Sequence, residues 1–227
     1  MMVFMAPEIV PIKIESAFFV ACLASTPKRV FLSKLNEFMK CAALSTKNCV
    51  MYKKLPKRRY ELTMEFLKKE LPVPARILDL GVRNPFTEWM EEAGYEVVNT
   101  GGGDLDFDPS EVNAEGFDAV TAFEIIEHLV NPMPMLQQIK APKLLASIPM
   151  RLWFASAYRS STDKWDRHYH EFEDWQFDWL MEKGGWEITN SEQWTAPSKH
   201  PFGIRPFLRQ FTKRYYIVSC ERREQQD

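Results

Sequence analysis

The sequence predicts an α/β fold in which a doubly wound, mostly parallel sheet carries helices on both faces. Short apolar runs alternate with helical patterns from residue 75 onward, which is typical of βαβ units. The run Arg76-Ile77-Leu78-Asp79-Leu80-Gly81 stops on an acid and a glycine before a helical pattern begins, as a buried parallel strand does when it leads into a ligand-binding turn. Connections of these lengths favour right-handed crossovers, so ligands are expected at the carboxyl ends of the strands.

Each element has its own signal in the pattern. Apolar runs predict strands at 76–80, 95–99, 117–123, 143–148, 186–191 and 215–221. Helical spacing predicts helices at 60–70, 85–93, 132–139 and 171–183, and glycines end the second and the fourth. Within the last helix, the spacing predicts that four apolar residues face the core: Phe172, Trp175, Trp179 and Leu180. The segment 197–211, with Pro201, Gly203 and Pro206, is predicted to be a loop across the mouth of a site.

Composition bounds the class of protein. The chain has 227 residues, of which 45% are hydrophobic and 26% are charged, and this fits one globular domain with an appendage. A net charge of −2 and a pI near 6.1 make nucleic acid an unfavoured partner and give no attraction to anionic membranes. The four cysteines show no CxxC spacing, so neither a disulfide framework nor a zinc site is indicated, and a cytoplasmic location is expected. No run is long enough to span a bilayer, and nothing in the sequence sets the oligomeric state.

The chain is predicted to divide near residue 50. Residues 1–50 are punctuated by prolines, and only 30–44 has a helical pattern, so they are interpreted as an extension outside the catalytic fold. A cleaved signal peptide is disfavoured because Glu8 and Glu15 precede the apolar run 17–24. Residues 51–227 are predicted to form the functional domain, with an aromatic-rich lid or insertion at about 150–170. The lid candidates are Trp153, Phe154, Tyr158 and Trp165.

Four motifs in order resemble the class I S-adenosylmethionine-dependent methyltransferases, over roughly Tyr60 to Arg222. They are the segments Ile77–Gly81, Phe117–Leu129, Leu144–Pro149 and His168–Phe172, the last ahead of a helix that ends in Gly184-Gly185-Trp186. The resemblance implies a Rossmann-like fold, S-adenosylmethionine as cofactor and methyl transfer as the activity. It also implies a set of cofactor-binding residues: Asp79, Gly81, Thr100, Gly101, Asp104, Asp106, Phe123 and Glu124.

Two positions depart from that family. Val82-Arg83-Asn84-Pro85 stands where further glycines are usual after Gly81. Gly101 stands where the family places an acid for the ribose hydroxyls, and Asp104 or Asp106 could supply it because the glycines 101–103 permit unusual backbone paths. Asp106 also falls where similar proteins hold a carboxylate near the adenine amino group. The alternative is a solvated acidic loop that caps a helix starting near Pro109.

The motif E-x-x-E-H places Glu124, Glu127 and His128 just after the 117–123 strand. It is similar to a motif of ubiquinone-biosynthesis and small-RNA 2'-O-methyltransferases, in which it accompanies a divalent metal, and a metal there would lower the pKa of an accepting hydroxyl. A metal site is not favoured, because Glu-His at this point also occurs in relatives without a metal role. His128 and His168 are the candidate catalytic bases, and His170 is a weaker one.

Three functions stay open. The favoured one is methyl transfer to a small-molecule hydroxyl or amine. The second is an RNA 2'-O-methyltransferase, which the E-x-x-E-H motif and the basic segments 53–59 and 205–214 support and the acidic pI disfavours. The third is a degenerate fold that binds a ligand without catalysis, because the glycine turn is altered.

Overall fold

The structure, a computed structural model, describes residues 56–197 and 202–223. Contacts divide the chain into two units, Met1–Lys53 and Lys54–Asp227, and everything below concerns the second. The predicted extension and its 30–44 helix lie outside the described residues. Among the residues described, no helix has the length and apolar character needed to cross a membrane.

The centre of the fold is a sheet that, within the described residues, has six strands in the order β2-β1-β3-β4-β6-β5. Pairing is parallel from β2 through β4 and antiparallel between β4, β6 and β5. The strands are β1 (Arg76–Asp79), β2 (Glu96–Asn99), β3 (Ala119–Phe123), β4 (Lys143–Pro149), β5 (Trp186–Thr195) and β6 (Lys213–Arg222). All six lie where the apolar runs predicted strands, and the mostly parallel α/β sheet is confirmed.

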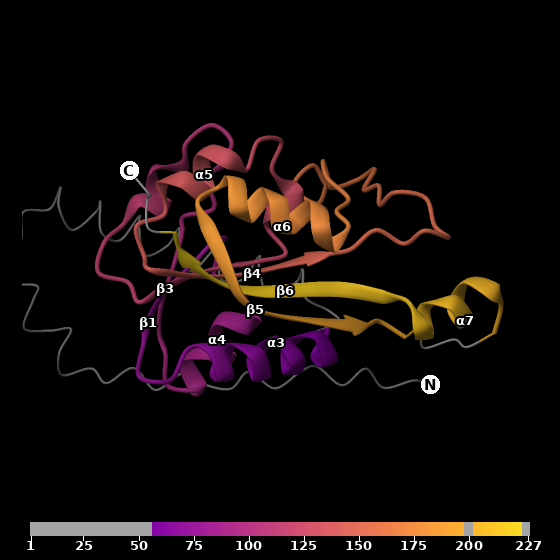
Figure 1. The fold of residues 1–227 in the computed structure, drawn as a ribbon, viewed down its shortest axis with the longest axis horizontal. Helices are drawn as coiled ribbons and strands as arrows, with labels where there is room; N and C mark the ends of the chain where they lie inside the picture. The colour runs from indigo at the N-terminus through magenta and orange to yellow at the C-terminus, as the bar shows by residue number, and fades with distance from the viewer. Residues whose placement is uncertain (1–55, 198–201, 224–227) are drawn as a thin grey trace, which may run out of the picture. The chain divides into compact units, whose positions relative to one another are not determined.

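Helices cover both faces of this sheet (Figure 1). One face carries α3 (Lys57–Glu70) and α4 (Pro85–Glu92), and the other carries α5 (Met133–Gln138) and α6 (Asp174–Lys183). Neighbouring strand residues point to opposite faces, so Ile77 packs with the α3–α4 core while Leu78 packs with the α5–α6 core. The two cores hold the sheet from both sides and fix its carboxyl edge, where the site lies.

Helix α4 explains the residues that follow Gly81. The Asn84 side chain accepts hydrogen bonds from the backbone N–H groups of Phe86 and Thr87, and the Thr87 hydroxyl accepts one from Asn84 N–H. This capping box, with Pro85 at the first helical position, starts the helix. Asn84 and Pro85, which stand where glycines are usual, therefore serve to start helix α4.

The segment predicted as a loop contains a helix, α7 (Ile204–Phe211), so that prediction was wrong. Gly203 precedes the helix with a φ of 111°, and Pro206 falls within its first turn. A proline in the first turn breaks no helical hydrogen bond, because the first N–H groups have no partner inside the helix. Pro206 was thus misread as a helix breaker.

The prediction that α6 buries Trp175 and Trp179 was also wrong. Their exposed fractions are 45% and 64%, and their rings pack edge to face on each other. The helix instead buries Phe177 and Met181, while Phe172 just before it is buried as predicted and Leu180 packs partly against the core. Helical spacing identified an apolar stripe, but α6 has two such stripes and only packing selects the inner one.

Candidate active site at the carboxyl edge of the sheet

Asp79, at the end of β1, is a buried junction between four elements. Its carboxylate accepts hydrogen bonds from Thr121 Oγ1 on β3 at 2.7 Å and from Asn99 Nδ2 on β2 at 2.9 Å, with a longer one from Thr87 Oγ1 on α4 at 3.4 Å. Burial raises the pKa of Asp79 to about 6, and these three donors oppose the rise. Through these three hydrogen bonds Asp79 holds the ends of β1, β2 and β3 and the start of α4 together.

Gly81 and Thr100 connect the first two strand ends. Gly81 has a φ of 104°, and its N–H donates to Thr100 Oγ1 at 2.7 Å, while Thr100 N–H donates to the Asp79 carbonyl at 3.1 Å. A residue with a side chain would be strained at this φ. The predicted residues Gly81, Thr100 and Gly101 are thereby brought together at one edge, and Gly101 exposes its backbone there.

The glycine-rich turn after β2 makes room for Val82. Gly102 has a φ of 76°, and a Cβ placed on it would lie 2.4 Å from Val82 Cγ1. Of the three consecutive glycines, this is the one whose conformation and surroundings both exclude a side chain. The valine that follows Gly81 and the glycine at position 102 are thus complementary in shape.

Glu111 is a site residue that sequence reasoning missed. Its Oε2 accepts a hydrogen bond from Gly101 N–H at 2.7 Å, and a Cβ placed on Gly101 would lie 3.0 Å from its Oε1. The Glu111 carboxylate therefore occupies the space that a side chain at position 101 would begin to fill. Glu111 lies in the short helix η1 (Pro109–Asn113). Its only signal in the sequence was that an acid follows the unexpected Gly101.

The two aspartates proposed to replace the missing acid, Asp104 and Asp106, accept hydrogen bonds from the backbone. Both carboxylate oxygens of Asp106 accept backbone N–H bonds, from Val130 at 2.7 Å and Asn131 at 2.8 Å, and so fix the segment between β3 and α5. Asp104 Oδ1 accepts from Asp106 N–H at 3.1 Å, which closes its own turn. The cap of η1 is Asp108, which accepts from Ser110 N–H.

Glu124, just after β3, has a φ of 57°, which is uncommon for a residue with a side chain. Its carboxylate lies 2.9 Å from Arg59 Nη1 and accepts from Ser147 Oγ at 3.1 Å. Burial raises the pKa of Glu124, while Arg59 and Ser147 oppose the rise. The glutamate thereby joins α3 to β4, and the ring of the neighbouring Phe123 packs edge to face on Phe86.

Glu127, His128 and His168 form a cluster beside this junction. Candidate ligand atoms of the three lie within 4.8 Å of one another, and the two imidazole rings meet edge to face with centroids 4.7 Å apart. His128 Nδ1 lies 3.0 Å from the Arg167 carbonyl, so Nδ1 carries the proton and Nε2 is the basic nitrogen. The structure thus brings both predicted bases together across 40 residues of sequence, whereas His170 bonds separately to the Val130 carbonyl.

The electrostatics of the cluster differ from residue to residue. Burial, with a smaller contribution from nearby His128, lowers the pKa of His168 to about 4, so His168 is uncharged at neutral pH. Burial raises the pKa of Glu127 well above its usual value, and Glu124 raises it further. Glu127 Oε2 is buried and has no hydrogen-bond partner among the described residues, while Oε1 lies 3.7 Å from His128 Nε2.

One carboxylate and two imidazoles fit the preferences of a divalent metal. The set differs from the one grouped by sequence, because Glu124 is engaged by Arg59 and Ser147 and His168 takes its place. The same residues equally form a pair of bases beside a buried acid. The cluster is therefore able either to hold a metal or to accept a proton on an imidazole, because both uses need the same ring nitrogens.

Comparisons with known proteins give the fold. No protein-family model matches the chain, and no curated protein matches it in sequence. Among solved structures, it is similar to 1,6-didemethyltoxoflavin-N1-methyltransferase from Burkholderia thailandensis, which has 1,6-didemethyltoxoflavin and S-adenosylhomocysteine bound. The sequence identity is 14% and the TM-score is 0.53, and the match covers 88% of this chain and 92% of that one.

A second similar structure is a protein assigned as an S-adenosylmethionine-dependent methyltransferase, from Listeria monocytogenes. Identity is 12% and the TM-score is 0.51, over 73% of this chain and 99% of that one. The chain therefore has the fold of class I S-adenosylmethionine-dependent methyltransferases, as the sequence resemblance implied.

Proposed function

We propose that the protein transfers a methyl group from S-adenosylmethionine to a hydroxyl or amine of a small molecule. The observation that carries this proposal is the carboxyl edge of β1 and β2, where the exposed backbone of the Gly101 turn lies beside the Glu111 carboxylate. The similar Burkholderia enzyme, which holds S-adenosylhomocysteine and a small molecule, supports the same cofactor and acceptor class.

The residues at this edge fit the cofactor. Gly81 lets the backbone come close to a ligand, and Glu111 supplies at Gly101 the carboxylate that would accept hydrogen bonds from the ribose hydroxyls. Asp79 and Thr100 hold these groups in place and need not touch the cofactor. Bound there, S-adenosylmethionine would supply a methyl group on a sulfonium, and S-adenosylhomocysteine would leave as the acceptor takes the methyl.

The chain's own contribution to transfer is alignment, exclusion of water and removal of a proton. His168 is uncharged at neutral pH and so has a lone pair available, and His128 presents Nε2 beside it. We assign these two residues as the candidate bases. Glu127 lies beside His128 as a positioning residue.

Binding of S-adenosylhomocysteine to the full chain tests the proposal. Saturating ligand is expected to stabilise the protein, by about 2.7 kcal/mol when its concentration is a hundred times Kd. Thermal shift and calorimetry would measure this. Absence of stabilisation at millimolar ligand would contradict the proposal and favour a degenerate fold.

A matched pair of variants tests the role of Glu111. Glu111→Gln is expected to weaken S-adenosylhomocysteine binding by about tenfold, because a charge-assisted hydrogen bond to the ribose is lost. Glu115→Gln, an equal charge change at an exposed residue with no hydrogen bond or ion pair in the described part of the chain, is the control. Equal effects of the two substitutions would rule out the ribose contact.

The metal alternative has a separate test. Calorimetric titration of magnesium, manganese and zinc into the cofactor-loaded protein is expected to give no saturable binding. Binding that disappears in His168→Gln would instead assign the Glu127, His128 and His168 cluster to a metal.

A further inference from the structure

A cavity of about 300 Å³ lies beside the base cluster, between α7, the start of β6 and the segment that follows β4. Pro149 at the end of β4 pairs with Tyr215, so Arg214 and the residues after 149 lie at the carboxyl edge of the sheet. Figure 1 shows α7 and the segment after β4 at this same end of the sheet. The cavity volume is at the lower end of the range for small-molecule sites.

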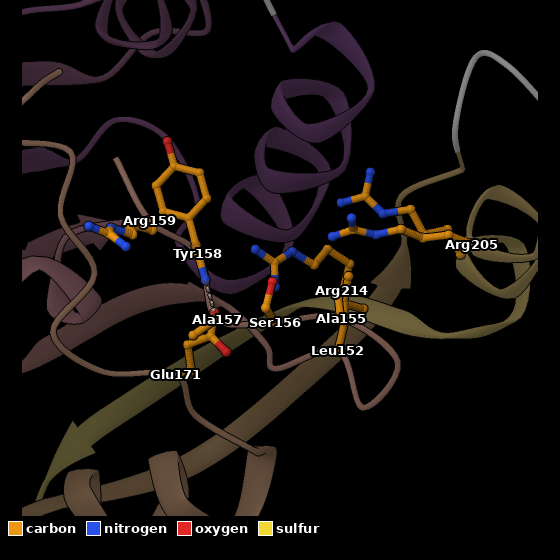
Figure 2. Close-up of a pocket in the computed structure, with 10 residues that line it drawn as sticks. Leu152, Ala155, Ser156, Ala157, Tyr158, Arg159, Glu171, Arg205 and Arg214 are labelled. Carbon is orange, nitrogen blue, oxygen red and sulfur yellow. Dashed lines mark hydrogen bonds between the residues drawn. The ribbon is translucent and has the colours of Figure 1, made fainter. Parts of the chain in front are cut away.

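Arginine side chains dominate the wall of this cavity. Arg205 and Arg209 reach it from α7, and Arg214 reaches it from β6. In Figure 2 the Arg205 side chain extends from α7 toward Arg214, whereas Arg159, on the far side of Tyr158, extends away from both. Three guanidinium groups from two elements therefore line one small space.

These arginines have few partners of their own. Within the described residues none of the three forms an ion pair, and the buried Nε of Arg209 has no hydrogen-bond partner. Arg214 donates to the Met150 carbonyl, which is uncharged. The one acid in the cavity wall is Glu171, whose Oε1 accepts from Tyr158 N–H at 2.6 Å. The cavity thus holds an excess of positive charge that a bound anion would neutralise.

The cavity adjoins the candidate bases. Tyr158 lines the cavity, and its ring lies 4.5 Å from the His168 ring, centroid to centroid; the His168 ring lies 4.7 Å from that of His128. An anionic group held by the arginines would place the rest of a small molecule near these histidines. The cavity is therefore placed to anchor the methyl acceptor.

We propose that this cavity binds a phosphate monoester group of the methyl acceptor, so that the substrate is a small phosphorylated molecule. One guanidinium can satisfy a carboxylate through two parallel hydrogen bonds, whereas three guanidinium groups match the charge and the three terminal oxygens of a phosphate monoester. That the phosphorylated molecule is the methyl acceptor rests on the proposed function. The anion site itself rests only on the cavity.

Titration of inorganic phosphate into the full chain, at constant ionic strength with chloride as the balancing ion, tests the anion site. Saturable binding is expected by calorimetry, with acetate binding at least about tenfold more weakly because it offers a single charge. Arg205→Gln and Arg209→Gln are each expected to weaken phosphate binding by about tenfold. Arg205 is exposed, so its substitution leaves the fold intact even if Arg209→Gln does not.

Two further variants separate a local site from general charge. Glu171→Gln is expected to strengthen phosphate binding several-fold, because it removes the one negative charge from the wall. Arg151→Gln makes the same charge change as the test variants at an exposed residue outside the wall, paired with Glu173, and is expected to leave binding unchanged. Equal losses in Arg151→Gln and Arg205→Gln, or no saturable phosphate binding, would overturn the proposal.

Failure of this inference and failure of the proposed function are distinguishable. Absence of phosphate binding with normal S-adenosylhomocysteine binding would overturn the inference alone. Phosphate binding without S-adenosylhomocysteine binding would overturn the proposed function, and with it the identification of a methyl acceptor, but would leave the anion site. A 5'-phosphorylated RNA oligomer that bound far more tightly than adenosine monophosphate, with a steep salt dependence, would overturn a small-molecule acceptor in favour of RNA.

Discussion

A single carboxylate holds the ends of three strands and one helix in this protein. Asp79 accepts hydrogen bonds from Thr121, Asn99 and Thr87 and is only 4% exposed. Ionisation of a buried carboxyl is costly, so its pKa rises to about 6 from an ordinary 3.8. The folded state therefore binds the Asp79 proton more tightly than the unfolded state does, and the stabilisation is largest below pH 4.

This linkage gives a pH prediction. As pH rises from about 3 to 7, the Asp79 contribution to the free energy of unfolding is expected to fall by roughly 3 kcal/mol. Asparagine does not titrate, so the difference between wild type and Asp79→Asn isolates the effect, and urea denaturation at a series of pH values would measure it. A difference that stays constant or grows with pH would contradict the raised pKa.

His168 is the second residue with a measurable prediction. Its imidazole is expected to titrate near pH 4, because burial disfavours the charged form and the adjacent His128 ring adds repulsion. Substitution of His128 by glutamine is expected to raise the pKa of His168 while leaving it below 6.5, since burial is the larger cause. Nitrogen-detected NMR titration would follow both histidines, and a value near 6.5 for His168 in the wild type would refute the lowered pKa.

At the scale of elements, the turn after β1 packs against the turn after β2. Val82 after Gly81 fills the space that a side chain at Gly102 would need, with a Cβ there only 2.4 Å from Val82 Cγ1. Val82 replaces a usual glycine in the first turn, and Gly102 in the second turn leaves room for it. Asn84 and Pro85 meanwhile start α4, so the altered turn is also a helix N-terminus.

A double-mutant cycle tests this fit. Gly102→Ala is expected to cost about 1–2 kcal/mol or more of unfolding free energy, from the left-handed φ of 76° and from the contact with Val82. Adding Val82→Ala should recover the part due to the contact and none of the part due to backbone strain, giving a coupling energy of about 0.5 kcal/mol or more. Strictly additive effects in chemical denaturation would show that the two turns are independent.

At the scale of the whole molecule, the described sheet, its helices and the candidate site all belong to the unit Lys54–Asp227. Among residues 56–197 and 202–223, two cores lie each between one sheet face and its helices. We therefore expect a chain that begins at residue 54 to unfold cooperatively and to bind S-adenosylhomocysteine as the full chain does. Circular dichroism and calorimetry would compare the two. Loss of either property would show that residues 1–53 take part in the fold or the site.

The elements were predictable because each depends on a local pattern. Four helices and six strands lie close to the predicted ranges, since apolar periodicity records which face is buried. The errors arose where a local signal admits two outcomes. A proline breaks a helix when it lies in the interior, but Pro206 lies in the first turn of α7, where no helical hydrogen bond is lost. Helix α6 has two apolar stripes, and packing buries the one that contains Phe177.

Sequence alone determined the α/β class, and it named Gly81, His128 and His168 as candidates at the edge where a ligand is predicted to bind. Only the tertiary structure decided which polar groups meet there: Glu111 at Gly101, His168 at His128, and the arginines of α7 and β6 around one cavity. The physical reason is that helix and strand signals come from neighbours along the chain. A site forms between residues that only the paired sheet and its packed loops bring within a few ångströms.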